Sequence, residues 1–122
     1  MSMNKKDEHS MSKKIIKEIA VACKKTDGFG MIIEVHSEDH GILGDKTNPA
    51  HAHIKSSSEE YLGKFEITQQ APRFVNHIIN IDKNIQIPIK YKEKIIKWAS
   101  SKNEDDILYW FFLKSLWKAL HP

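Results

Sequence analysis

Cysteine and arginine are scarce in this sequence, and each scarcity argues against particular structural features or functions. Cys23 is the only cysteine, so no disulfide can form within the chain and no CxxC motif is present. Arg73 is the only arginine among nineteen basic residues, the others being lysines. Because arginine provides most bidentate contacts to guanine and phosphate, its scarcity argues against sequence-specific binding of nucleic acids.

Long apolar runs are missing as well. No stretch approaches the about 18 consecutive apolar residues that a transmembrane helix needs. Residues 4–8 read Asn-Lys-Lys-Asp-Glu, which is unlike the apolar core of a signal peptide. We therefore expect a cytoplasmic protein with no membrane segment.

The residues that are present favour one folded domain. The chain has 122 residues, 40% of them hydrophobic, and includes three tryptophans and five phenylalanines. A chain of this length and composition can build one hydrophobic core. We expect residues 1–9 to form a flexible polar tail and residues 10–122 to form a single domain.

The N-terminal part of the chain has the spacing of an amphipathic helix. Ser10 stands at an N-cap position, and Ile15, Ile19 and Cys23 follow on one face. We predict a helix that ends near Lys25 and buries Cys23 as a structural thiol. A catalytic or redox role for this thiol is the alternative.

Short strands are predicted next. Alternating apolar and polar residues predict strands over 29–36, 50–56 and 61–68, and residues 79–87 resemble a hairpin that turns at 82–84. The polar segment 37–48 predicts an exposed loop, and loops of this length are often functional. The pattern predicts an α+β fold, in which an antiparallel sheet of four or five short strands packs against an N-terminal helix and two C-terminal helices.

The two C-terminal helices are predicted over residues 91–100 and from Asn103 onward. Asn103 is the expected N-cap of the last helix, and three acidic residues at 104–106 would occupy its first turn. This helix is apolar on nearly every side, which a small domain cannot easily bury. We therefore predict an interface with a second copy of the chain or with a small protein partner, formed by Trp110, Phe111 and Trp117.

Histidines are concentrated in the middle of the chain. His51 and His53 are two residues apart on a predicted strand, so their side chains share one face, as in strand-borne zinc, iron and copper sites. Antiparallel pairing would bring His36 or Glu34 alongside. The hypothesis is a divalent transition-metal site with ligands drawn from His51, His53, His36, His40 and Asp39.

Two alternatives to the metal hypothesis stay open for these histidines. They could be exposed imidazoles on the solvent face of a strand. They could also divide acid and base roles without a metal, because an imidazole titrates near neutral pH.

Part of the sequence resembles a small uncharacterised bacterial domain family. The matching residues are Phe29-Gly30-Met31-Ile32-Ile33, then Asp39-His40, then Asn48-Pro49-Ala50-His51-Ala52-His53. The family carries a Tyr/Phe-Gly-hydrophobic strand followed by Asp-His-Asn-Pro-Pro-His-Phe-His. Family members are short, cytosolic and often encoded beside toxin–antitoxin or mobile elements, with no established activity.

This sequence departs from the family signature in three places. Residues 41–47 separate His40 from Asn48, Ala50 replaces the second proline, and Ala52 replaces the aromatic residue between the histidines. The resemblance implies that any functional residues are Asp39, His40, His51 and His53. It transfers a motif and not a mechanism.

Three functions follow from these patterns. The leading hypothesis is a non-enzymatic protein-interaction or regulatory module, because no complete catalytic set can be identified. The second is a metal- or histidine-dependent hydrolase or nuclease centred on His51 and His53. The third is nonspecific binding of nucleic acid through lysine-rich faces, with an affinity that falls steeply with salt. The sequence leaves open whether the protein is an enzyme.

Overall fold

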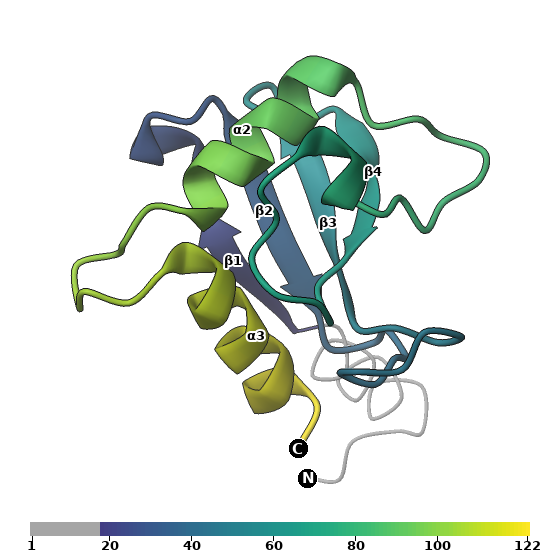
Figure 1. Ribbon diagram of the computed structural model, residues 1–122. Helices are drawn as coiled ribbons and strands as arrows, with labels where there is room; N and C mark the ends of the chain where they lie inside the picture. Colours follow the sequence, from purple (N-terminus) through teal and green to yellow (C-terminus); the bar gives the residue numbers. More distant parts are fainter. Residues whose placement is uncertain (1–17) are drawn as a thin grey trace, which may run out of the picture.

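The computed structural model describes residues 18–122 and contains a four-stranded antiparallel sheet in the order β1-β2-β3-β4 (Figure 1). The strands are β1 (Ile19–Cys23), β2 (Met31–His36), β3 (His51–Ser56) and β4 (Tyr61–Glu66). The helices are α2 (Ile89–Ala99) and α3 (Tyr109–Leu120), with short 3-10 turns η1 (Lys25–Asp27) and η2 (Val75–His77). The α+β class and the two C-terminal helices are thus confirmed. The predicted tail, residues 1–9, lies outside the described residues.

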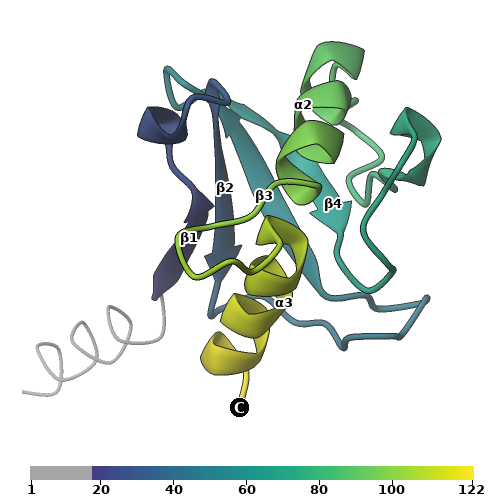
Figure 2. The ribbon, with the colours of Figure 1, turned by 60° about the vertical axis from the view of Figure 1, so that its left-hand side comes forward.

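The alternation of side chains along β2 gives the sheet two different faces. Met31, Ile33 and Val35 are fully buried and belong to the hydrophobic core, which also contains the buried faces of α2 and α3. Both helices lie on this side of the sheet (Figures 1 and 2). Because successive side chains of a strand point to opposite faces, Glu34 and His36 lie on the face away from the helices.

Aromatic residues fix α3 against the sheet. The indole of Trp110 is fully buried, stacks on Phe65 of β4 with 6.1 Å between ring centroids, and donates from Nε1 to the Gln69 carbonyl at 2.9 Å. Trp117, about two turns further along the same face of the helix, is 3% exposed. Burial of the Trp110 indole, with its Nε1 hydrogen-bonded, strongly favours the packing of α3 against the sheet.

The predicted N-terminal helix is wrong where the structure describes it. Residues 19–23 form β1, which pairs with β2 through Ile19–His36, Ala20–Val35 and Val21–Glu34. The pairing register shifts between Val21 and Cys23, so that Ala22 and Cys23 are both buried. This irregularity disturbs the two-residue period of a strand and leaves a spacing that resembles a helix. Residues 10–17 of the predicted helix lie outside the described residues.

The predicted hairpin over residues 79–87 is also absent, so the sheet has four strands in the part described. Asn80 makes only an isolated bridge with Phe65, flanked by hydrogen bonds from Glu66 N to Ile79 O and from Ile81 N to Lys64 O. The Asn80 amide donates to the Ile85 carbonyl, and its Oδ1 accepts from Asp82 N at 3.2 Å. These side-chain hydrogen bonds replace the second strand of a hairpin.

The last helix begins at Tyr109 and not directly after Asn103. Asn103 Oδ1 instead accepts from the backbone N–H groups of Asp105 and Ile107 at 2.9 and 3.0 Å. Asp106 has a φ of 62°, in the left-handed region, which an α-helix cannot include. The acidic residues therefore form a turn before the helix. No helix among residues 18–122 is long and apolar enough to cross a membrane.

Candidate metal centre

The candidate site lies where the loop between β2 and β3 leaves and rejoins the sheet. His36 is the last residue of β2, and His51 and His53 begin β3. Glu34 pairs directly with His53 across the two strands, so both side chains lie on the sheet face away from the helices. The strand pairing therefore brings the histidines of two predicted strands together, as the sequence indicated.

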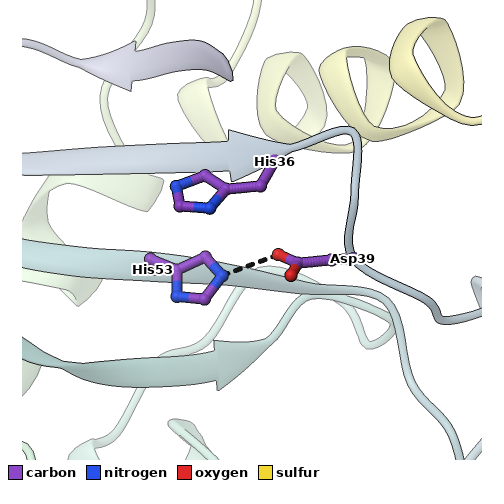
Figure 3. A group of neighbouring side chains, drawn as sticks. All are labelled: His36, Asp39 and His53. Atoms are coloured by element: carbon purple, nitrogen blue, oxygen red, sulfur yellow. Dashed lines mark hydrogen bonds and ion pairs between the residues drawn. The ribbon is translucent and has the colours of Figure 1, made fainter. Parts of the chain in front are cut away.

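Asp39 completes a group of three possible ligands with His36 and His53. One ligand atom from each of the three side chains lies within 4.8 Å of the other two. His53 Nε2 is 2.6 Å from Asp39 Oδ2, and the rings of His36 and His53 stack with centroids 4.2 Å apart. Figure 3 shows the two imidazoles side by side on β2 and β3, with the Asp39 carboxylate reaching across from the loop.

The loop is closed at its base, and this closure places Asp39. Ile42 N donates to Asn48 O at 2.9 Å, and Ala50 N donates to Ile42 O at 3.2 Å. Gly41 lies against the returning chain so closely that a Cβ atom there would be 2.6 Å from the Pro49 carbonyl oxygen. Residues 43–47 thus protrude from the loop, while Ile42 is hydrogen-bonded to Asn48 and Ala50 at its base, next to the start of β3.

His51 has acceptors at both ring nitrogens. Its Nδ1 is 3.2 Å from the Pro49 carbonyl oxygen, and its Nε2 is 3.3 Å from Asp39 Oδ2. A carbonyl and an ionised carboxylate accept hydrogen bonds only. Both contacts are therefore favourable in two cases: the imidazole carries two protons, or a metal ion takes the place of the proton on Nε2.

The other two imidazoles are also oriented by neighbours. His36 Nε2 lies 3.1 Å from Glu34 Oε1, and Lys55 Nζ lies 3.1 Å from the same oxygen. His53 Nδ1 lies 3.4 Å from the hydroxyl of Tyr61. Metal-binding histidines usually hydrogen-bond a carboxylate, backbone carbonyl or water through the nitrogen that does not bind the metal. In this arrangement a metal would bind Nδ1 of His36 and Nε2 of His53, and Nε2 of His53 would exchange its hydrogen bond to Asp39 for the ion.

The carboxylates of the site are held in their ionised form. Burial raises the pKa of Asp39, but hydrogen bonds from His51 and His53 and the charges of these rings outweigh it, so the pKa lies well below its usual range. Burial also raises the pKa of Glu34, and hydrogen bonds from His36 and Lys55 reverse the shift and lower it. Asp39 therefore offers a charged oxygen at any physiological pH.

The remaining predicted residues lie elsewhere. His40 is exposed and does not belong to the group of three ligand atoms. Trp110 and Trp117 are buried within the chain, and Phe111 is 48% exposed. The sequence reasoning missed Lys55 and Tyr61 as supporting residues. Lys55 could have been found, because it shares the strand face of His51 and His53.

Comparisons with protein-family models, with curated proteins and with solved structures found no match for this chain. The chemistry of the site is therefore inferred from its donor set. Two imidazoles and a carboxylate, with a third imidazole adjacent, are ligand types found in catalytic zinc and non-haem iron sites.

Proposed function

We propose that the protein binds one divalent transition-metal ion through His36, Asp39 and His53 and acts as a metal-dependent hydrolase of esters or phosphodiesters. The observation that supports this proposal best is the convergence of three ligand atoms from β2, the loop and β3 within 4.8 Å. Each histidine of the group also has a hydrogen-bonding neighbour at its other nitrogen. Such neighbours orient a ligand and raise its basicity.

The donor set fits a metal after small rotations of its side chains. Zinc–nitrogen and zinc–oxygen bonds of about 2.0–2.2 Å place neighbouring ligand atoms about 3.3 Å apart. Ligand atoms now up to 4.8 Å apart would therefore move together, whereas His53 Nε2 and Asp39 Oδ2, now 2.6 Å apart, would move apart as the ion replaces their hydrogen bond. His51 Nε2, already 3.3 Å from Asp39 Oδ2, is available as a fourth ligand or as a hydrogen-bond donor to the carboxylate.

Three protein ligands would leave a coordination position for water. A divalent ion held here would supply activation of a water molecule as a nucleophile. Asp39 would offset part of the charge of the ion, while Glu34 accepts from His36 and Lys55 forms an ion pair with Glu34. The side chains of His36 and His53 are 18% and 12% exposed, so part of each ring reaches the protein surface.

The first test is metal content by mass spectrometry on protein purified without chelator. We expect about one transition-metal ion per chain, lost in His53→Ala and retained in His40→Ala. The second variant is the matched control, because His40 is an exposed histidine of the same loop. A parent protein that neither contains nor takes up a metal on titration would contradict the proposal.

The second test is hydrolysis of bis(p-nitrophenyl) phosphate and p-nitrophenyl acetate by the metal-loaded protein. We expect turnover that depends on the ion and falls by at least about 100-fold in Asp39→Asn, which removes the charged ligand. If the protein binds one metal ion per chain but hydrolyses neither substrate, the metal site would stand and the proposed hydrolase activity would be contradicted.

A protein-interaction function through α3 is the second candidate. One observation favours it: Phe111 is 48% exposed, although the same helix buries both of its tryptophans, at 110 and 117. Its ring borders a hollow lined also by Leu108, Pro72 and Arg73. A partner would bury this ring against the hollow.

A further inference from the structure

Glu66 is a charged side chain in an unusual position at the end of β4. The residue is only 9% exposed, although glutamate is among the residues least often buried without a partner. Its Oε1 accepts a hydrogen bond from the Thr68 hydroxyl. Among residues 18–122 no lysine, arginine or histidine forms an ion pair with it. A mostly buried glutamate without a cationic partner costs free energy, part of which a cationic ligand would recover.

The Glu66 side chain lines a hollow of about 570 Å³. The other lining residues are Gly44, Lys46, Thr68, Gln69 and Ile79. The apolar side chain of Ile79 and the amide of Gln69 give the hollow both an apolar wall and polar groups. This combination matches a ligand with an aliphatic stem and a polar, charged end.

The hollow borders the candidate metal centre. Glu66 is the direct strand partner of His51, and the loop that carries Asp39 also contributes Gly44 and Lys46 to the hollow. Side chains of directly paired residues have Cβ atoms about 4.5–5.5 Å apart. A molecule seated against Glu66 would therefore lie beside His51, whose Nε2 is 3.3 Å from Asp39 Oδ2.

We propose that this hollow is a binding site for an ammonium or guanidinium group on an aliphatic stem, with Glu66 as its counter-ion. Thr68 orients the carboxylate through Oε1 and leaves Oε2 for the ligand. The site itself does not need the metal. Its role as the subsite that positions a substrate's cationic group rests on the hydrolase proposed above.

Lys46 does not satisfy Glu66 in this structure. Its side chain is exposed, and no ion pair joins the two residues. A flexible, hydrated ammonium at the rim gains little from an exposed ion pair and loses side-chain freedom in making one. Glu66 is the less exposed of the two charged residues that line the hollow, so we expect it to favour a cationic ligand.

The test is a titration of the whole 122-residue chain with four capped amino acids of similar size. The backbone amide signals in NMR spectra report binding. N-acetyl-lysine and N-acetyl-arginine methylamides carry the proposed groups, the norleucine compound carries only the stem, and the glutamate compound carries the opposite charge. We expect saturable shifts at residues 66, 68 and 69 for the two cationic probes. Glu66→Gln should weaken their affinity roughly tenfold or more, the range for a lost charge-assisted hydrogen bond.

Glu60→Gln is the matched control, because it removes the same charge from an exposed glutamate at the turn before β4. It should leave the affinity unchanged, and His53→Ala should also retain probe binding while it loses the metal. Equal affinity for the norleucine probe, tighter binding of the glutamate probe, or undiminished binding in Glu66→Gln would each overturn the cation site. Absence of metal with intact probe binding would overturn the hydrolase alone.

Discussion

Asp39 and His53 are fourteen residues apart in the chain, yet Oδ2 of the one lies 2.6 Å from Nε2 of the other. The same oxygen lies 3.3 Å from Nε2 of His51. One carboxylate oxygen therefore serves two imidazoles from the start of β3. A change at Asp39 should alter the interactions of both rings and the anchoring of the loop that carries it.

The stability of the protein should depend on Asp39 in the acid range. Its folded-state pKa lies below its unfolded value of about 3.9, so the ionised carboxylate contributes stability above that pH, and the contribution is lost as the pH falls toward the folded pKa. We expect Asp39→Asn to lower the free energy of unfolding near pH 7 by about 1–3 kcal/mol. Urea unfolding should show a difference between parent and variant that shrinks steadily below about pH 4.

Glu34 should affect metal binding without contacting the ion. It accepts from His36 Nε2 at 3.1 Å and is itself held by Lys55. Glu34→Gln should weaken zinc affinity by about 10–100-fold, the usual effect of removing such a partner. Competition with a chromogenic chelator measures this change. Glu38→Gln, an exposed glutamate of the same loop, is the control and should retain the parent affinity.

Gly41 should be necessary for the closure of the loop. A methyl group there would lie 2.6 Å from the Pro49 carbonyl oxygen and 3.1 Å from Ala50 Cα, and both neighbours are backbone atoms that cannot rotate away. We expect Gly41→Ala to cost about 1–3 kcal/mol of stability and to displace Asp39. The midpoint temperature of thermal unfolding and the affinity for zinc should both fall. An unchanged zinc affinity would show that the closure does not position the ligand.

The alternation of apolar and polar residues along the strands made part of the site predictable from the sequence. Residues 29–36, 50–56 and 61–68 alternate clearly, and the structure has strands inside each range. A two-residue period places His51 and His53 on one face wherever the strand lies in the fold. His36 could then be predicted as part of the site if β2 and β3 pair antiparallel, and short connections in a small domain favour such pairing.

The rest of the site depends on contacts that no local pattern contains. Asp39 and His40 are adjacent in the sequence, but only Asp39 reaches the imidazoles, because hydrogen bonds between Ile42, Asn48 and Ala50 fix the path of the loop. The helix predicted through Ile19–Cys23 is wrong for a related reason. Pairing with β2 and the register shift at Val21 decide that structure, and neither is visible in a single segment.

Cys23 should behave as an unreactive structural thiol. The side chain is fully buried on β1, and burial, followed by the charge of Asp27, raises the pKa of the thiol to about 12. Only the thiolate reacts with disulfide reagents. We expect the native protein to react with Ellman's reagent at pH 8 at least about 100-fold more slowly than the urea-unfolded protein. Fast reaction of the native protein would show that β1 opens readily.

Phe111 provides the test of an interface on α3, because the two neighbouring tryptophans cannot be changed without damage to the core. Trp110 and Trp117 are 0% and 3% exposed, whereas Phe111 is 48% exposed, with Lys114 Nζ 5.8 Å from its ring centroid. Phe111→Gln keeps good helix propensity and should change the stability by no more than about 0.5 kcal/mol.

If this face binds a second copy, sedimentation velocity should show a dimer of the parent that shifts to monomer in Phe111→Gln. Ile89→Gln is the matched control, since Ile89 is 65% exposed on α2, and it should leave the dimer intact. A parent that sediments as a monomer across the accessible concentration range would exclude self-association through Phe111. Because the variant leaves the metal ligands untouched, the same samples should contain the parent's metal, which would show that Phe111 acts independently of the metal site.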